Sequence, residues 1–121
     1  MENKKVILIV DDDQIVKLLL SAKLKKRGYD VLLASNGAEG IEALKGSTVH
    51  LVLTDFLMPV MNGLDFLVEA GALNTRIPMI MMSSDRTAST LKRAFDSGAI
   101  DYLIKPVNTE DLLERIDRYI F

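Results

Sequence analysis

Five short apolar runs, separated by segments of helical periodicity, set the strongest limit on how this chain can fold. Each run is almost uniformly apolar, as is typical of a strand that is buried on both faces of a parallel sheet. The runs cover residues 6–10, 31–34, 51–53, 79–82 and 102–104. Strands that alternate with helices in this way predict an α/β fold, with a parallel sheet and helices on both of its faces.

The segments between the runs carry apolar residues at three- and four-residue spacing, which places them on one side of a helix. In the first segment, which ends near Arg27, Val16, Leu20 and Leu24 form the stripe and Leu19 widens it. The stripes of the later segments are Ile41 and Leu44; Leu64, Leu67 and Val68; Leu91, Ala94 and Phe95; and Leu113, Ile116 and Ile120.

Polar residues and glycines mark where these segments begin and end. Asp12 or Asp13 is expected to cap the first helix, Gly28 to end it, and Asn108 or Thr109 to cap the last. No linker or internal repeat interrupts the pattern, so residues 1–121 are expected to form one domain. The prediction is a single doubly wound, flavodoxin-like (βα)₅ domain with the strand order 2-1-3-4-5.

Charge and composition exclude several classes of function. The net charge of −2 and the pI of about 5.3 give no electrostatic reason to expect direct nucleic-acid binding. The absence of cysteine excludes disulfides, thiolate chemistry and zinc–thiolate sites. The first apolar run is too short for a signal peptide or a membrane span. We therefore expect a cytoplasmic protein with neither nucleic-acid nor membrane partners.

Charged and hydroxyl side chains stand where the apolar runs end. Asp55 follows the run of residues 49–53, Asp11 and Asp12 follow the first run, Ser83 follows the fourth and Lys105 the fifth. The carboxyl ends of neighbouring parallel strands lie side by side, roughly 5 Å apart, and border the ligand crevice of open α/β sheets. These five side chains are therefore expected to converge on one site.

The size of the charge repulsion in such a site indicates which ligand it would bind. Two carboxylates about 4 Å apart repel by roughly 4 kcal/mol at an effective dielectric near 20, a large share of a total stability of about 5–15 kcal/mol. Lys105 offsets part of this repulsion, and a divalent cation would offset the rest. Oxygen ligands without His or Cys favour Mg²⁺, with Mn²⁺ as an alternative. Asp55 is then the expected nucleophile, forming an aspartyl phosphate whose oxygens Ser83 and Lys105 hold.

The same residues resemble the receiver domain of two-component response regulators, the CheY-like family, over essentially the whole chain. Asp11 and Asp12 are similar to the acidic pair that follows the first strand in that family. Asp55, with the Met-Pro pair at 58–59 and the Asn-Gly pair at 62–63, is similar to its phosphorylation site and the loop beyond it.

The resemblance extends to a conformational switch. Ser83 falls at the family's switch Ser/Thr position, Tyr102 at its aromatic switch position, and Lys105-Pro106 matches its Lys-Pro pair, whose peptide bond is expected to be cis. It implies that phosphorylation draws Ser83 and Lys105 towards the phosphate while Tyr102 swings inward. The face made by the fourth helix, fifth strand and fifth helix would then change its affinity for partners.

The resemblance also implies partners and a metal site. A histidine kinase or a phosphotransfer protein would present a phosphohistidine to Asp55. Mg²⁺ would be bound by Asp12, Asp55 and the backbone carbonyl of Leu57, with Asp11 contributing through water. The protein would catalyse only its own phosphorylation and dephosphorylation, and would act on an output domain, a downstream protein or a second copy of itself. A free-standing regulator and a part of a longer chain both remain open.

Two positions near the nucleophile depart from the commonest family pattern. Leu57, two residues after Asp55, is apolar where many relatives carry a polar side chain. Its side chain cannot orient a hydrolytic water, so the resemblance implies slow self-dephosphorylation. Asp85, two residues after Ser83, would either orient that water or repel it.

Three other functions would use some of the same residues. A phosphatase of the haloacid dehalogenase type has an aspartate nucleophile, but it needs an acid where Leu57 stands. A flavodoxin-type cofactor binder needs a loop rich in Ser, Thr and Gly after the first strand, where residues 11–13 are all aspartate and would repel phosphate. A degenerate receiver acting only as a binding scaffold would not need the complete set of site residues.

Residues outside this set are interpreted as structural. His50 is the only histidine, and a structural role is favoured over a role as phosphodonor. The methionines of the fourth run are expected in the core. Met58 and Met61 lie in the loop after Asp55 and are expected to be partly exposed.

Overall fold

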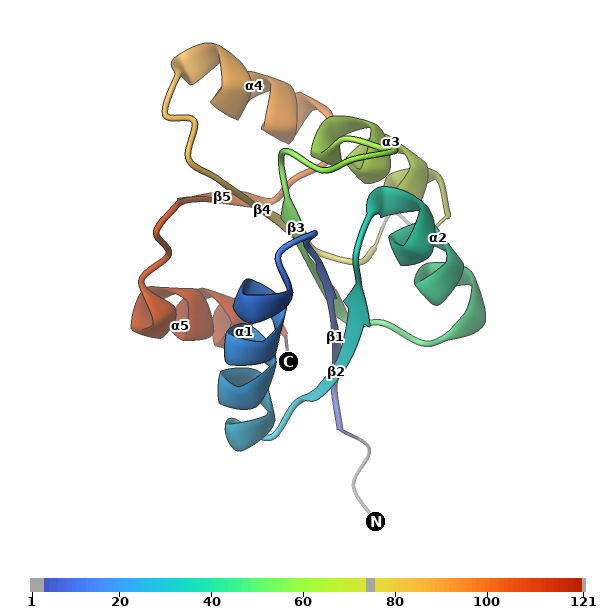
Figure 1. Ribbon diagram of the computed structural model, residues 1–121, viewed down its shortest axis with the longest axis vertical. Helices are drawn as coiled ribbons and strands as arrows, with labels where there is room; N and C mark the ends of the chain where they lie inside the picture. Colours follow the sequence, from blue (N-terminus) through green and yellow to red (C-terminus); the bar gives the residue numbers. More distant parts are fainter. Residues whose placement is uncertain (1–3, 74–75, 121) are drawn as a thin grey trace.

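The computed structural model describes residues 4–73 and 76–120, in which five strands alternate strictly with five helices (Figure 1). The strands are β1 (Val6–Val10), β2 (Asp30–Ala34), β3 (Leu51–Asp55), β4 (Met79–Ser83) and β5 (Asp101–Ile104). The helices are α1 (Gln14–Lys26), α2 (Gly37–Gly46), α3 (Gly63–Leu73), α4 (Ala88–Asp96) and α5 (Thr109–Tyr119). All strand pairs are parallel, in the order β2-β1-β3-β4-β5, so the predicted topology is confirmed.

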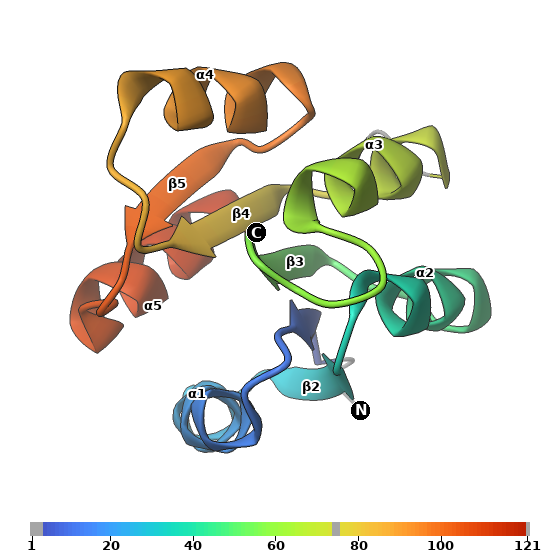
Figure 2. The same ribbon diagram turned by 45° about the horizontal axis from the view of Figure 1, so that its top comes forward.

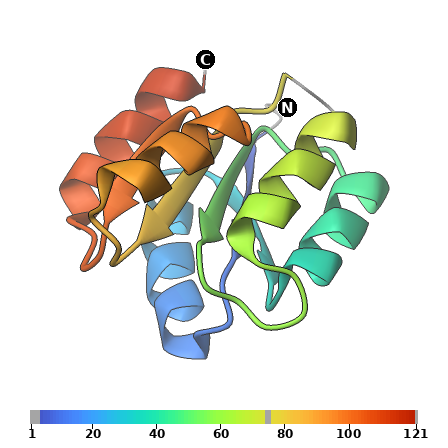
Figure 3. The ribbon, with the colours of Figure 1, turned by 90° about the horizontal axis from the view of Figure 1, so that it is seen from above.

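The sheet lies between two layers of helices. Helices α1 and α5 cover one face, and α2, α3 and α4 cover the other (Figures 2 and 3). Side chains of β1 alternate between the two cores: Ile7 and Ile9 pack with α1 and α5, whereas Leu8 and Val10 pack with the other three helices. Because both faces are covered, the strands need no polar face, which explains their uniformly apolar sequence.

Within residues 4–73 and 76–120, no helix is long and apolar enough to cross a membrane. The longest, α1, has 13 residues, whereas a helical span needs about 20.

The helix caps resolve the two choices that the sequence left open. Asp13, not Asp12, caps α1, because its Oδ1 accepts hydrogen bonds from the backbone N–H groups of Ile15 and Val16 at 2.9 and 3.2 Å. Asn108, not Thr109, caps α5. The side chain of Asp12 is therefore not used for capping and is available to the site at the end of β1.

Three residues predicted to lie on buried helix faces are exposed instead. The exposed fraction is 59% for Leu19 in α1, 58% for Val68 in α3 and 45% for Phe95 in α4. Each of them is next in sequence to a residue that is buried, as Leu19 is to Leu20. Adjacent residues point about 100° apart around a helix, so only one of the two faces the sheet. The apolar stripes that contact the sheet are therefore narrower than predicted.

The structural interpretation of the histidine and methionines is confirmed. His50 lies just before β3 and is half-buried, and its Nδ1 accepts a 2.9 Å hydrogen bond from the backbone N–H of Val6. The three methionines of β4 are 4% exposed or less, and Met58 and Met61 are half-buried.

Candidate functional site

The carboxyl ends of β1, β3, β4 and β5 meet at one edge of the sheet and bring the predicted site residues together. In the register of the strands, Val10 is level with Thr54, Asp55 with Met82, and Ser83 with Ile104. Asp11 follows β1 and Lys105 follows β5 directly. Side chains that are far apart in the sequence therefore lie at nearly the same height along the strands, at the carboxyl edge of the sheet.

Three carboxylates form the centre of this site. Asp11, Asp12 and Asp55 each place one carboxylate oxygen within 4.8 Å of the other two. Asp11 is completely buried and Asp55 is 7% exposed, whereas Asp12 is open to solvent. Carboxylates this close repel one another by several kcal/mol where water is excluded. The arrangement needs cations to be stable in its ionised form.

Lys105 supplies one of these cations. Its Nζ lies 3.0 Å from Asp55 Oδ1 and 3.5 Å from Asp11 Oδ2. Burial alone would lower the pKa of Lys105, but the hydrogen bond to Asp55 and the charges of Asp11 and Asp55 outweigh it and raise the pKa. Lys105 therefore stays charged and holds the two least exposed carboxylates together.

The remaining charge fits a divalent cation. Three carboxylates and one ammonium leave a formal charge of −2 on ligands that offer only oxygen. Hard cations such as Mg²⁺ prefer such ligands, and Mg²⁺ keeps several waters when few carboxylates hold it. The exposed side of Asp12 leaves room for those waters.

Burial makes Asp11 the least favourable of these groups to ionise. Desolvation raises its pKa, and the nearby charge of Asp55 raises it further. A hydrogen bond from the backbone N–H of Asp13, at 2.9 Å, and the charge of Lys105 act in the opposite direction but do not cancel the rise.

Substituting Asp11 should therefore stabilise the metal-free protein. A raised pKa in the folded state favours folding below pH 3.8, and this contribution is lost as the pH rises through the folded pKa. At pH 7 without divalent cations, Asp11→Asn should raise the free energy of unfolding by about 1 kcal/mol, measured by urea denaturation. The gain should vanish near pH 3.

The matched control is Asp12→Asn, which removes an exposed carboxylate of the same cluster and should change the stability less. An Asp11→Asn protein that is less stable than the wild type at pH 7 without divalent cations would contradict the prediction.

Ser83 is held in place by the loop between β4 and α4. It is 3% exposed, and its Oγ accepts a 3.0 Å hydrogen bond from the backbone N–H of Asp85. Because an N–H group can only donate, the hydroxyl hydrogen of Ser83 remains available to donate elsewhere. Ser83 is therefore positioned as a donor.

The carboxylate of Asp85 accepts hydrogen bonds from two threonines at the start of α4. Its Oδ1 accepts hydrogen bonds from the N–H and the Oγ1 of Thr87, both at 2.8 Å, and its Oδ2 accepts one from Thr90 Oγ1 at 2.9 Å. These bonds lower its pKa. The carboxylate of Asp85 is thus bonded to the start of α4, and its two alternative roles towards a hydrolytic water stay predictions.

Tyr102 lies in the inward position. It is 8% exposed, and its hydroxyl donates a 2.7 Å hydrogen bond to the carbonyl oxygen of Asp85. The position that the family resemblance implies for the phosphorylated protein is thus the one seen in this structure.

The loop from β3 to α3, drawn in green in Figure 3, folds back so that Gly63 N–H donates a 2.8 Å hydrogen bond to the carbonyl oxygen of Phe56, next to Asp55. Gly63 permits this approach, since a Cβ there would lie 2.4 Å from the carbonyl oxygen of Asp55. Leu57 is 69% exposed and Val60 is 85% exposed, with a φ of 72° that is strained for a β-branched residue. The loop that follows Asp55 therefore carries exposed apolar side chains. The peptide bond between Lys105 and Pro106 is cis, as predicted.

Two polar residues near the site were not singled out from the sequence. Lys17 is 2% exposed, and its Nζ lies 2.6 Å from Ser35 Oγ. Thr90 is 5% exposed and contacts Asp85. A signal for Thr90 existed, because Asp85 precedes a segment rich in Ser and Thr at the start of a helical pattern. Nothing in the sequence distinguishes Lys17 from an exposed helix lysine.

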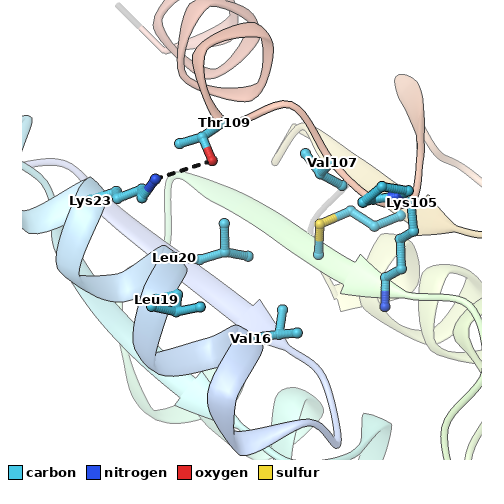
Figure 4. Close-up of a pocket in the computed structure, with 9 residues that line it drawn as sticks. Val16, Leu19, Leu20, Lys23, Lys105, Val107 and Thr109 are labelled. Carbon is cyan, nitrogen blue, oxygen red and sulfur yellow. Dashed lines mark hydrogen bonds between the residues drawn. The ribbon is translucent and has the colours of Figure 1, made fainter.

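A cavity of about 360 Å³ adjoins the site between α1 and the segment leading into α5 (Figure 4). Leu19 and Leu20 of α1 lie across it from Val107, and Lys105 lines it as well as contacting Asp55. Beside the cavity, α1 carries the exposed apolar side chains of Ile15, Leu18 and Leu19. Lys105 therefore borders both the cavity and the acidic site.

Comparison with known proteins agrees with this geometry. Residues 7–117 match the response regulator receiver domain family. The transcriptional regulatory protein ZraR of Escherichia coli K12 is 38% identical over 112 residues, which are 93% of this chain and 25% of that protein. The two-component response regulator ORR3 of Oryza sativa subsp. japonica is 34% identical over 117 residues, which are 94% of this chain and 89% of that protein.

Solved structures share the fold throughout. A CheY-like response regulator receiver domain protein from Methanospirillum hungatei JF-1 has a TM-score of 0.92 at 33% identity, covering 96% of this chain and 93% of that one. A two-component response regulator from Clostridium difficile has a TM-score of 0.93 at 26% identity, covering 96% and 95%.

The chain belongs to the response regulator receiver domain family. It is a phosphoacceptor signalling module of the two-component type, and neither the phosphatase nor the pure scaffold is favoured. The chain spans about a quarter of the length of ZraR and most of the length of ORR3.

Proposed function

We propose that Asp55 is the phosphoacceptor and that residues 1–121 form one receiver domain that catalyses only its own phosphorylation and dephosphorylation. The observation that carries the proposal is the 3.0 Å contact between Lys105 Nζ and Asp55 Oδ1 within a cluster of three carboxylates. Of these, Asp55 combines contact with Lys105 and partial access to solvent. The test is the intact mass after incubation with Mg²⁺ and acetyl phosphate, in which one phosphoryl group adds about 80 Da.

Each residue of the site has a separate role in the proposed phosphoryl transfer. A carboxylate oxygen of Asp55 attacks phosphorus, the bond from phosphorus to the donor's imidazole nitrogen breaks, and the imidazole leaves with the electron pair and takes up a proton. Lys105 and the Ser83 hydroxyl hold the phosphoryl oxygens. Asp12 and Asp55, the carbonyl of Leu57, and Asp11 through water would hold Mg²⁺, or Mn²⁺ in its place, which neutralises charge on the phosphoryl group when bound.

The exposed side of α1 is the proposed docking surface for the phosphohistidine protein, a histidine kinase or a phosphotransfer protein. That partner must reach Asp55 from the open end of the site, and α1 begins three residues after Asp11 at the same end. Ile15, Leu18 and Leu19 present an apolar strip beside the cavity that Lys105 lines. Exposed apolar strips of this kind mark protein interaction sites.

A substitution in this strip should separate the two kinds of phosphodonor. Leu18→Ser should slow phosphotransfer from a phosphohistidine protein roughly tenfold, the loss expected for one buried interface side chain. Phosphorylation by acetyl phosphate should be unchanged, because a small donor does not touch α1. The measurement is the initial rate of mass gain with each donor.

Val68→Ser is the matched control, because Val68 is 58% exposed and Leu18 60% exposed, but Val68 lies on α3. Equal losses in the two variants, or a loss with acetyl phosphate as well, would contradict a docking role for α1.

Leu57 is proposed to lengthen the life of the phosphorylated form. Its side chain is 69% exposed and offers no hydrogen-bonding group to a water near Asp55. Leu57→Asn should speed the loss of the phosphoryl group about tenfold, because an amide can orient an attacking water. The measurement is the decay of the phosphorylated mass after the donor is removed, with Val60→Asn as a control in the same loop. Equal decay in the wild type and Leu57→Asn would count against the proposal.

The face of α4, β5 and α5 is the proposed output surface. It carries a network in which Asp101 accepts hydrogen bonds from Arg115 at 2.7 Å and from the Tyr119 hydroxyl at 2.9 Å, beside the exposed side chains of Phe95 and Ile100. An output domain, a downstream protein or a second phosphorylated copy would bind here, with an affinity that phosphorylation changes.

A further inference from the structure

Asp85 is bonded through each of its three polar groups to a different part of the molecule. Its backbone N–H donates to Ser83 Oγ at 3.0 Å, and its carbonyl accepts from the Tyr102 hydroxyl at 2.7 Å. Its carboxylate accepts three hydrogen bonds from Thr87 and Thr90. One residue thus connects the predicted phosphate-binding hydroxyl, the predicted aromatic switch and the first turn of α4.

The carboxylate of Asp85 bonds to two residues at the start of α4, where the usual side-chain N-cap bond is missing. Thr87 stands at the N-cap position of α4, but its side chain makes no capping bond to the helix. Its Oγ1 donates instead to Asp85 Oδ1, and its N–H donates to the same oxygen. Thr90, which is 5% exposed, donates its hydroxyl to Asp85 Oδ2. The start of α4 is therefore fastened to residue 85 rather than closed by its own N-cap side chain.

We infer that Asp85 is a positioning residue whose carboxylate fixes Ser83, Tyr102 and α4 relative to one another. When the Ser83 hydroxyl moves, the N–H of Asp85 that is bonded to it moves as well. Asp85 then displaces α4 through its carboxylate and Tyr102 through its carbonyl. Without the carboxylate, the peptide of residue 85 is no longer tied to α4, and the Tyr102 ring loses a fixed acceptor. The coupling of α4 to phosphorylation rests on the proposed function of Asp55, whereas the placement of Tyr102 does not.

The first test needs no phosphorylation. In Asp85→Ala, the ratio of inward to exposed Tyr102 rings should fall roughly fivefold, the factor that the net loss of one hydrogen bond corresponds to. The measurement is the relaxation of the Tyr102 ring protons by a soluble paramagnetic probe, which reaches only exposed rings. Asp85→Asn keeps one acceptor oxygen and should restore part of the protection.

Asn36→Ala is the matched control, because Asn36 caps α2 through a 2.9 Å bond from Glu39 N–H and lies outside the β4–α4 loop. It should lower stability as any cap deletion does, but leave the Tyr102 ring protected. Protection in Asp85→Ala equal to that of the wild type would overturn the inference, as would equal exposure in Asn36→Ala. Should Asp85→Ala fail to fold, Thr90→Val, which keeps the side-chain volume, carries the same expectation.

The second test measures coupling. Acetyl phosphate should add one phosphoryl group to Asp85→Ala as to the wild type, while the amide resonances of α4 shift on phosphorylation in the wild type and in Asn36→Ala but not in Asp85→Ala. An unaltered α4 response in Asp85→Ala would overturn the coupling. Absence of any mass gain in the wild type would instead refute the proposed role of Asp55 and leave the Tyr102 result to decide the positioning role.

Discussion

Asp55→Ala should abolish the gain of about 80 Da that Mg²⁺ and acetyl phosphate give the wild type. No neighbouring carboxylate can take over the role of Asp55. Asp11 is completely buried, and its oxygens are occupied by the N–H of Asp13 and by Lys105. Asp12 is exposed, but no ion pair joins it to Lys105 among the described residues. A phosphoryl group at either position would lack the access or the ammonium that Asp55 has.

Two further variants make this result decisive. Asp55→Asn keeps the shape of the side chain and an oxygen for the 2.9 Å hydrogen bond from Phe56 N–H, so its failure to gain mass cannot be attributed to misfolding. Asp65→Ala removes an exposed carboxylate in the first turn of α3 and should gain mass like the wild type. An equal gain in Asp55→Ala would refute the assignment of the phosphoacceptor.

The fold was predictable because the strands are buried on both faces. The five apolar runs located every strand to within two residues at either end, and the residues that followed them located the site. The exposed side chains of Leu19, Val68 and Phe95 were not predictable, since an apolar residue beside a stripe looks the same whether it faces the sheet or a partner. For this reason the proposed docking surface on α1 could not be predicted from the sequence.

The components of the site were predictable, but their hydrogen bonds were not. Acidic, hydroxyl and ammonium groups at strand ends must converge in a parallel sheet, so Asp55 and Lys105 were found from position alone. The hydrogen bonds of Asp85 depend on the path of the four-residue loop between β4 and α4. The sequence of such a loop has no periodicity from which its path could be predicted. Its spacing from Ser83 indicated a role towards water, whereas its hydrogen bonds fasten a helix.

Removal of Mg²⁺ with a chelator should slow phosphorylation of Asp55 by acetyl phosphate at least about a hundredfold. The charge of the site is the reason: Lys105 neutralises one of three carboxylates, so a phosphoryl donor that carries further negative charge is repelled. A bound metal ion that stabilises such charge contributes several kcal/mol, and each 1.36 kcal/mol changes a rate tenfold. The measurement is the initial rate of mass gain with Mg²⁺ and with excess chelator.

The same cation should be visible without any phosphodonor. A ligand that binds only the folded state raises the free energy of unfolding, by about 2.7 kcal/mol at a hundred times its Kd. Urea denaturation at increasing Mg²⁺ should therefore show a rising midpoint for the wild type. The rise should be strongly reduced in Asp12→Asn, which lacks one carboxylate of the cluster, and retained in Asp65→Ala. A midpoint that does not respond to Mg²⁺ would mean that the three carboxylates hold no metal, and that Lys105 alone balances the charge of the site.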